Sequence, residues 1–377
     1  MAVDGLTVFL CGDVMTGRGI DQILAHPGDP ALHEPVVDDA RTYVALAEQA
    51  NGPIAKPVDP GWPWGDAIAV LDDVAPQIRL LNLETAITPN SAFAPGKAVH
   101  YRMHPDNVAC LTAIRPDVCV LANNHVLDFG QAGLTDTLST LGRAGIAHAG
   151  AGETVEQAER PVAVDVPGGR VITVAAGMKS SGIPGGWAAT ADSPGIALVP
   201  DLSKRSATGL AERVLSGKRP GDVTVVSLHW GGNWGYRPES GQRRFAHRLI
   251  DAGVDVVYGH SSHHPRPIEV YRGKLILYSC GDIVNDYEGI RSHTEYRDEL
   301  RLLYFATIDH DDGELMAVRM APMRARRMRL ERASRADAAW LRSTLDHASR
   351  RFGTRVDADA DGMLCVRPSR SQKRVLQ

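Results

Sequence analysis

The sequence predicts an α/β fold, and three observations lead to this prediction. Short β-branched apolar runs recur along the chain, as expected of strands that are buried on both faces of a sheet. Helical patterns separate several of these runs, which is typical of α/β proteins. The chain has 377 residues, 44% of them hydrophobic and 23% charged, so it has an ordinary globular composition and can form a large core.

Seven segments are predicted to be strands, and each ends in polar residues. They are residues 6–14, 78–84, 118–125, 170–177, 222–231, 254–264 and 274–282. Helices are predicted at 39–50, 133–145, 241–253 and 335–352. The two middle helices close on a glycine, which is a common C-terminal stop. The Pro-, Asp- and Gly-rich stretch 24–65 is expected to run over the sheet as a long excursion.

The composition bounds the domain organisation and the partners. We expect one main domain over residues 1–322 and a basic extension over 323–377, with one helix and a frayed tail. Lys and Arg number 41 against 45 Asp and Glu, so the formal charge is −4 and nucleic-acid binding is not expected. No apolar run approaches the roughly 18–20 residues of a membrane helix, and "LTVFLCG" is too short for a signal peptide. We therefore expect a cytoplasmic protein without a membrane partner.

Polar residues gather at five predicted strand ends. They are Asp13, then Asn82 with Glu84, then Asn124, His125 and Asp128 in "ANNHVLDFG", then His229, and finally His260, His263 and His264. Because the carboxyl ends of strands line the ligand crevice in an open α/β sheet, we expect these side chains to meet. Carboxylate, amide and imidazole groups are the ligands of divalent cations. The sequence therefore predicts a metal site at this edge of the sheet.

Several of these residues also have a purely structural interpretation. Asp13 can cap a helix, and His229 can be a buried core histidine. Asp128 either orients His125 or ends a turn, and the residues alone do not separate these roles. Asp282 follows the last predicted strand, where it either joins the site or caps a helix. Of the three histidines at 260–264, we expect two in the site and one in packing.

Tryptophans form a second group of candidates. Trp187, Trp230 and Trp234 lie in predicted loops or at strand ends, close to Gly- or Pro-rich sequence. Core packing is the default for a tryptophan. Aromatic rims also bind extended organic substrates and exclude water, so we predict that these three contact a substrate.

Some stretches of this sequence resemble a known family. The stretches "GDVM", "NLET", "NNHVLDFG", "LHWG" and "GHSSHHPRPIEVYRGKLILYS" with the following "GD" resemble the CapA (capsule poly-γ-glutamate) branch of the calcineurin-like metallophosphoesterases. The resemblance covers roughly residues 6–290. It implies a central β-sandwich flanked by helices, with metal bound at the strand ends.

The resemblance also implies roles for particular residues. Asp13 matches the aspartate of the first motif, Asn124 the asparagine ligand, and His125 the adjacent histidine that works as an acid. Glu84 stands near the position of the metal-bridging acid, with Asn82 beside it. His229 and His260 match imidazole ligands, and His263 takes the second histidine position of the last motif.

The sequence departs from the family pattern at several positions. Met15 stands where the first motif usually has a histidine, and a thioether is a poor ligand for hard cations. Asn82 and Glu84 replace Gly-Asp-x-x-Asp, while many CapA proteins have an acid near Asn233 and an asparagine at the position of Asp282. We therefore expect one divalent ion per site rather than two, and Ca²⁺, Mn²⁺ or Mg²⁺ rather than Zn²⁺.

Several reactions fit such a site. The CapA-like group includes an enzyme that epimerises a residue of a lasso-peptide precursor, so we predict a metal-dependent isomerase that needs no redox cofactor and acts on a ribosomal peptide. His125 with an aspartate would form one acid–base pair, and one of His260, His263 or His264 with another aspartate would form the second. Asp128 and Asp282 are the candidate aspartates. The alternatives are a poly-γ-glutamate-type amide ligase or hydrolase, a metallophosphoesterase and a non-enzymatic binding module. Met15 and the altered second motif argue against phosphoester hydrolysis.

Overall fold

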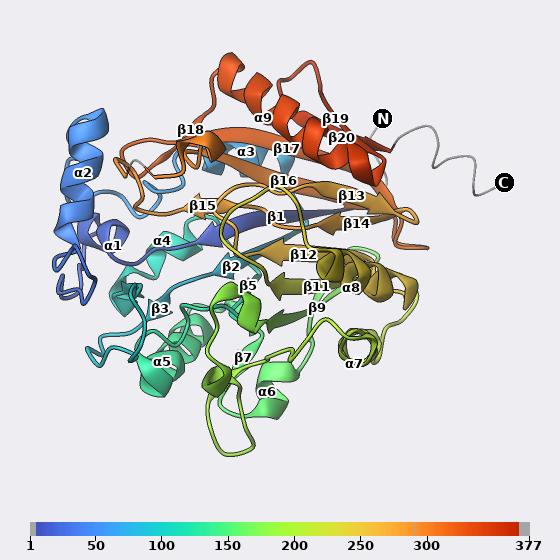
Figure 1. Cartoon of the computed structure of the whole chain (residues 1–377), viewed down its shortest axis with the longest axis horizontal. Coiled ribbons are helices and arrows are strands. Elements are labelled where there is room, and N and C mark those ends of the chain that lie inside the picture. Colours follow the sequence, from blue (N-terminus) through green and yellow to red (C-terminus); the bar gives the residue numbers. More distant parts are fainter. Residues whose placement is uncertain (1–4, 291, 369–377) are drawn as a thin grey trace.

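The computed structural model describes residues 5–290 and 292–368, and its centre is a sandwich of two large β-sheets (Figure 1). The larger, ten-stranded sheet has the order β19-β20-β17-β16-β1-β2-β5-β6, with β15 paired to β1 and β18 paired to β17. Its strands are β1 Leu6–Val14, β2 Ile78–Leu83, β5 Val118–Val120, β6 Ala147–Ala149, β15 Asp282–Val284, β16 Leu300–Ile308, β17 Leu315–Ala325, β18 Leu330–Arg332, β19 Thr354–Ala358 and β20 Leu364–Pro368.

The smaller sheet has six strands in the order β13-β14-β12-β11-β9-β8. They are β8 Val162–Val166, β9 Gly169–Gly177, β11 Val223–His229, β12 Val256–His260, β13 Ile268–Tyr271 and β14 Lys274–Leu277. Two short pairs complete the strands: β3 Ala86–Ile87 with β4 Arg102–Met103, and β7 Ala151–Gly152 with β10 Gly195–Ile196.

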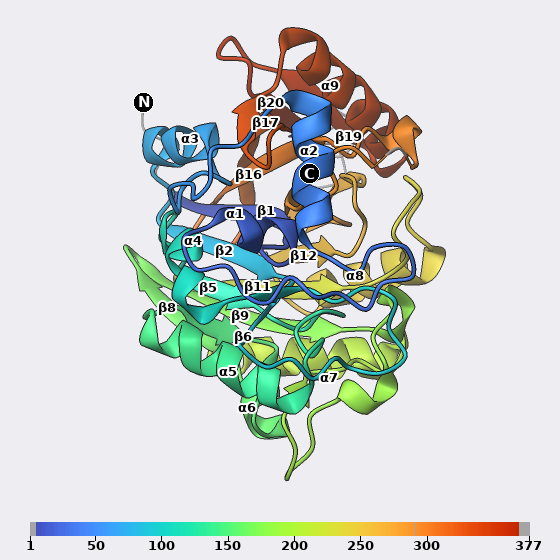
Figure 2. The ribbon, with the colours of Figure 1, turned by 90° about the vertical axis from the view of Figure 1, so that its left-hand side faces the viewer.

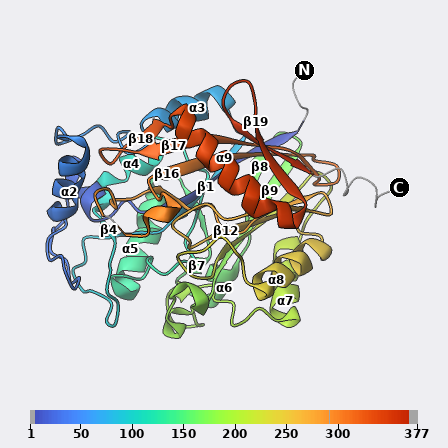
Figure 3. The same ribbon diagram turned by 45° about the horizontal axis from the view of Figure 1, so that its top comes forward.

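Helices cover the sandwich on both sides. They are α1 Gly19–Ile23, α2 Arg41–Asn51, α3 Asp66–Val74, α4 Ala109–Thr112, α5 Gly130–Arg143, α6 Val155–Glu159, α7 Lys204–Leu215, α8 Ser240–Asp251 and α9 Arg335–Ser349. Figure 2 shows the layers in order, from α9 at the top through the strands to α5, α6 and α7 at the bottom. Figure 3 shows α9 lying across the C-terminal strands, and it contacts β17 and β19.

Neighbouring residues of an inner strand of the smaller sheet pack in different cores, because side chains alternate between the two faces of a sheet. Val225 of β11 packs in one core cluster with Leu10 and Leu80 of the larger sheet. Its neighbour Val226 packs in a second cluster with α7 and α8, for example against Leu249. A strand covered on both faces must be apolar at every position, which accounts for the continuous runs in the sequence.

Parallel pairing brings the polar strand ends to one edge. The strands β1, β2 and β5 run parallel, as do β9, β11 and β12. In register, Asp13 pairs with Asn82 and with Asp282, and His229 pairs with His260. The predicted α/β fold, a central sandwich flanked by helices with polar strand ends gathered at one edge, is confirmed.

The predicted elements are present, with different boundaries. The segment predicted as a strand at 254–264 ends at His260, because Ser261 turns the chain with a φ of 93°. The segment predicted at 274–282 is two strands, β14 and β15, which lie in different sheets. β16 and β17 were not predicted, although they are among the longest strands of the larger sheet.

The predicted boundary between residues 322 and 323 falls inside β17. Residues 323–368 contribute part of β17 and the strands β18, β19 and β20 in addition to the predicted helix, α9. The division into two domains stays a prediction, and most of the predicted frayed tail lies outside the described residues. Within the described ranges, none of the helices has the length and apolar character needed to cross a bilayer.

Candidate metal centre

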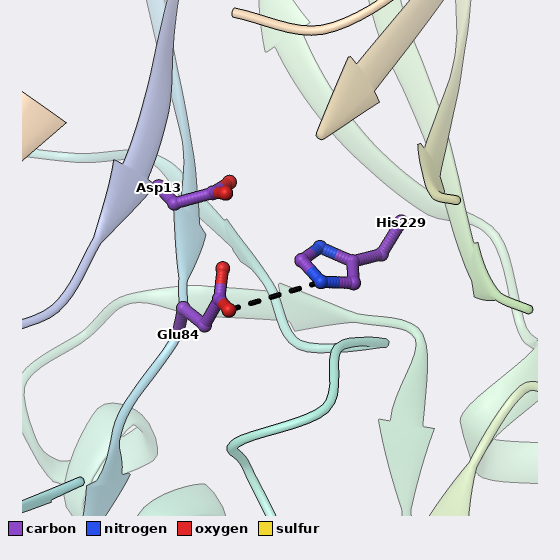
Figure 4. Close-up of side chains that lie close together, drawn as sticks. All are labelled: Asp13, Glu84 and His229. Atoms are coloured by element: carbon purple, nitrogen blue, oxygen red, sulfur yellow. Dashed lines mark ion pairs between the residues drawn. The ribbon is translucent and has the colours of Figure 1, made fainter. Parts of the chain in front are cut away.

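Three buried side chains from three strand ends form a cluster that offers ligands to a metal ion. Asp13, Glu84 and His229 each contribute one ligand atom, and these atoms lie within 4.8 Å of one another (Figure 4). Asp13 lies near the end of β1, Glu84 follows β2, and His229 ends β11. The cluster therefore joins the two sheets of the sandwich.

A close approach of two chain segments places Asp13. The sequence Cys-Gly-Asp occurs at 11–13 and again at 280–282, and the two copies run side by side. A Cβ atom on Gly12 would lie 2.0 Å from the carbonyl oxygen of Gly281, so only glycine fits there. The backbone N–H of Asp13 donates to that same carbonyl at 2.9 Å, which fixes where the carboxylate begins.

Asn82 holds the two carboxylates in position. Its Nδ2 donates to Asp13 Oδ1 at 2.8 Å and to Glu84 Oε2 at 3.3 Å. The Oδ1 atom of Asn82 accepts a hydrogen bond from Asn123 at 3.1 Å. In this arrangement Asn82 presents its amide N–H groups to the cluster, so its predicted role as an oxygen ligand stays a prediction.

Two histidines face the carboxylates from the smaller sheet. The Nε2 atom of His229 lies 2.7 Å from Asn124 Oδ1 and 3.8 Å from Glu84 Oε1, and its buried Nδ1 has no hydrogen-bond partner. His260 Nδ1 lies 3.3 Å from Asp13 Oδ1, and its Nε2 lies 3.0 Å from Ser227 Oγ. His229, His260 and Asn124 are therefore all brought to the cluster, as predicted.

Burial sets the charge state of this cluster. Burial raises the pKa of Glu84 well above its usual range, and the negative charges of Asp13 and Asp282 add to this effect. Burial alone would also raise the pKa of Asp13, but His260, His229 and Asn82 lower it to about 2. Burial lowers the pKa of His229 to about 3, so the ring is neutral near pH 7.

The donor set fits a divalent cation. Asp13 and Glu84 bring two carboxylates together in a buried place, and His229 is neutral with one unpartnered buried nitrogen. Close carboxylates destabilise each other unless one is protonated or a cation balances them. A single divalent ion with oxygen and imidazole ligands meets these requirements.

His125 lies beside the cluster and is oriented by a carboxylate. Its Nδ1 lies 2.6 Å from Asp128 Oδ2, and its Nε2 lies 3.9 Å from Glu84 Oε1. Asp128 also accepts from the backbone N–H of Tyr101 at 2.7 Å and from Lys97. Burial lowers the pKa of His125 to about 4, although Asp128 opposes this effect. Of the two interpretations of Asp128, the structure therefore favours orientation of His125.

A second histidine–carboxylate pair faces the same pocket. His263 Nδ1 lies 3.1 Å from Asp282 Oδ1, and Asn285 donates to Asp282 Oδ2 at 2.7 Å. Burial would lower the pKa of His263, but Asp282 raises it above its ordinary value. Glu84, His125 and His263 all line one pocket of about 390 Å³.

His264 and Trp230 lie away from this pocket. His264 is fully buried among the rings of Trp234, Tyr236 and Tyr296, so of the three neighbouring histidines it is the one that packs. Trp230 is completely buried against Phe245, and its Nε1 donates to a backbone carbonyl. The predictions that His264 is catalytic and that Trp230 contacts substrate are corrected, because neither side chain reaches the pocket.

The other two tryptophans lie near the site. The ammonium of Lys97 lies 4.9 Å from the ring centroid of Trp187, and Lys97 lines the pocket. Trp234 stacks on His293 at 4.3 Å between centroids, and its ring centroid is 5.3 Å from that of His263. Both tryptophans are partly exposed, so their predicted substrate contacts stay predictions.

Sequence reasoning missed Lys97 and Tyr287, which both line the pocket. Lys97 lies in the irregular segment "APGK", where no periodicity or motif marks a residue. The hydroxyl of Tyr287 contacts the Sδ atom of Met15 at 3.6 Å. A buried thioether therefore lies where the family pattern has a histidine.

Comparison with known proteins shows the family to which the chain belongs. A family model described as bacterial capsule synthesis protein, PGA_cap, matches residues 7–287. The chain belongs to the PGA_cap family. A probable polyglutamine synthesis accessory protein of Mycobacterium tuberculosis is 55% identical over 368 residues, which cover 97% of each protein. The PGA biosynthesis protein CapA of Bacillus subtilis is 29% identical over 285 residues, 75% of this PGA_cap chain and 64% of that protein.

A solved structure, the 5'-nucleotidase precursor from Thermus thermophilus, aligns with 84% of this PGA_cap chain and 54% of its own chain. Its TM-score is 0.42 and its sequence identity is 15%.

The comparisons confirm one prediction and overturn another. Membership of the PGA_cap family confirms the CapA branch that the sequence motifs predicted. The predicted isomerase is wrong, because these relatives are named as capsule or polyglutamine synthesis proteins. The lasso-peptide specificity has no support for the same reason. The predicted cytoplasmic location stays a prediction.

Proposed function

We propose that this PGA_cap chain is a metal-dependent enzyme that hydrolyses or transfers amide bonds of a glutamyl polymer during its synthesis. One observation carries the proposal. The buried cluster of Asp13, Glu84 and His229 adjoins a pocket that also holds an oriented histidine, His125. The printed names of its relatives, which refer to polyglutamine and PGA synthesis, supply the substrate class.

Asp13, Glu84 and His229 would hold the ion, with His260 and Asn124 beside them. A divalent cation held there supplies Lewis acidity toward a carbonyl oxygen. The protein's contribution is to fix the ligands. Asn82 fixes both carboxylates, and Asn124 fixes the ring of His229.

His125 would move the proton. Its Nδ1 lies 2.6 Å from a carboxylate oxygen of Asp128, which can only accept, so the proton lies on Nδ1. The lone pair of Nε2 then points toward Glu84 and the pocket, where it can take a proton from a nucleophile and deliver it to the leaving nitrogen. His263, held by Asp282, offers a second imidazole on the same pocket.

The proposal is tested on poly-γ-glutamate. Purified protein is stripped with a chelator, reloaded with Mn²⁺, Mg²⁺, Ca²⁺ or Zn²⁺, and incubated with the polymer. Chain length is followed by size-exclusion chromatography and new amino groups by an amine-reactive dye. We expect metal-dependent shortening or transfer that His125→Gln abolishes. The control His347→Gln, on the exposed face of α9, retains it.

Two outcomes contradict the proposal. One is that the polymer and its amino groups stay unchanged with every metal, although each metal binds. The other is that the loaded protein releases phosphate from phosphoesters and leaves the polymer intact, which would make the chain a phosphoesterase.

A further inference from the structure

A second pocket, of about 370 Å³, adjoins the pocket at the metal centre and shares Tyr287 with it. It contains a buried arginine, two of whose nitrogen atoms lack a hydrogen-bond partner among the described residues. Arg301, on β16, lines this pocket with only 2% of its surface exposed. Its Nε and Nη1 atoms are buried and have no hydrogen-bond partner among the described residues. Burying guanidinium N–H groups without hydrogen-bond partners costs folding free energy, so their presence indicates that Arg301 binds an anion.

Asp298 also lines this pocket; burial raises the pKa of its carboxyl, the charge of Arg301 opposes that rise, and no ion pair joins the two side chains among the described residues. The other charged groups already have partners. Arg297 pairs with Glu299 at 2.9 Å and with Asp337 at 2.6 Å. Arg324 lies 3.7 Å from Asp337.

Glu288 is satisfied by backbone N–H groups, since Arg327 and Met328 each donate to it at 2.8 Å. Among the cationic side chains that line this pocket in the described residues, Arg301 is therefore the one with N–H groups left to bind an anion.

The two pockets are joined by contacts between their residues. Asn285 lines the second pocket and donates to Asp282, which in turn holds His263 of the first pocket. Tyr287 belongs to both linings. A ligand that extends across Tyr287 can thus reach both Arg301 and the metal centre.

We propose that Arg301 binds a free carboxylate of the glutamyl polymer while a neighbouring part of that polymer lies at the metal centre. This inference rests on the proposed function. Each γ-linked glutamyl residue carries one free carboxylate, and the planar guanidinium matches a carboxylate with two parallel hydrogen bonds. Arg301 therefore sets the position of the chain relative to the reacting amide.

The test measures binding without turnover. Metal-free protein, kept in chelator, is titrated with a penta-γ-glutamate oligomer by calorimetry. We expect Arg301→Met to weaken binding about tenfold or more, as the loss of a charge-assisted bidentate contact implies. The oligomer whose carboxylates are replaced by carboxamides should bind the wild type as weakly as the intact oligomer binds Arg301→Met. As a control, Arg319→Gln on β17, which pairs with Asp359 outside both pockets, should keep wild-type affinity.

Thermal unfolding separates this role from a structural one. Because the Nε and Nη1 atoms of Arg301 have no hydrogen bond to lose within the described residues, Arg301→Met should unfold close to the wild-type temperature without oligomer, and the oligomer should raise the Tm of the wild type alone. Asp298→Asn removes a carboxylate from the same pocket and should tighten binding. A lower Tm for Arg301→Met together with unchanged oligomer affinity in either variant overturns the proposal. Since no metal is present, a failure of amide cleavage leaves this result intact.

Discussion

The Nδ1 atom of His125 and the Oδ2 atom of Asp128 lie 2.6 Å apart, and both side chains are buried. Lys97 and the backbone N–H of Tyr101 hold Asp128 from its other sides. Because the carboxylate fixes one nitrogen of the ring, the other is aimed at Glu84 and the pocket. In the proposed function, this pair would give the candidate metal centre a proton carrier of defined orientation.

Asp128→Asn should impair turnover without impairing metal binding. The amide can donate to Nδ1 and favour the wrong tautomer, so Nε2 would carry the proton. We expect amide cleavage to fall by at least about 100-fold, with metal affinity measured by calorimetry within a few-fold of wild type. Equal activity of the variant and the wild type would show that orientation of His125 by Asp128 is not needed for turnover.

Gly12→Ala should disrupt the fold at the centre. Its Cβ would lie 2.0 Å from the Gly281 carbonyl oxygen, and neither backbone segment can move without displacing Asp13 or Asp282. We expect a loss of several kcal/mol in the free energy of unfolding, or no folded protein. The matched control is Gly142→Ala in α5, where no atom lies within 4 Å of the added Cβ. That change should be neutral or stabilise by about 0.5–1 kcal/mol in urea unfolding.

Substitution of Trp187 and of Trp230 by alanine should differ in its effect on stability and on the KM for the polymer. Trp230→Ala removes a fully buried ring and should cost about 3–5 kcal/mol of stability. Trp187→Ala should cost less stability, because its ring is only partly buried against the core, but should raise the KM for the polymer, because Trp187 packs beside Lys97 at the pocket. Loss of stability in Trp187→Ala with an unchanged KM would show that this residue is structural.

Asp346 in α9 should make stability depend on pH. It accepts from Arg355 Nε at 2.7 Å and Arg350 Nε at 2.9 Å. Burial would raise its pKa, but these contacts lower it to about 2. The folded-state pKa thus lies below the unfolded value of about 3.9, so the stabilisation is present above about pH 4 and is lost as the pH falls towards 2.

Asp346→Asn should therefore lower the Tm at pH 7, and the difference in Tm from wild type should shrink between pH 5 and pH 3. A difference in Tm that stays constant over this range would show that Asp346 acts through packing rather than through its charge.

The sequence predicted the inner strands that carry the candidate site, and the residues of its cluster, because both leave local signals. Continuous apolar runs mark β1, β2, β5, β9, β11 and β12, and their polar ends mark Asp13, Glu84 and His229. Features that depend on the third dimension left no such signal. Lys97 lies in an irregular loop, and Arg301 follows an ordinary strand residue, Leu300. Trp230 was placed at the rim because a strand end does not reveal which face of the sheet is covered by α8.

The sequence could not predict the reaction, for a different reason. The same residues, His125 with Asp128 and His263 with Asp282, serve an acid–base isomerase and an amide hydrolase equally well. The proposed substrate class therefore rests on the names of relatives, which refer to polymer synthesis.

Whether Asp13, Glu84 and His229 bind a divalent ion is decided by a metal titration. Chelator-treated protein is titrated with Mn²⁺ and with Ca²⁺ by calorimetry, alongside Glu84→Gln and the control Glu212→Gln on the exposed face of α7. We expect one ion per chain for wild type and Glu212→Gln, and at least about 100-fold weaker binding for Glu84→Gln, because a lost ligand costs more affinity than the 10–100-fold of an outer contact. Equal affinity in Glu84→Gln and the wild type, or no binding by the wild type, would contradict it.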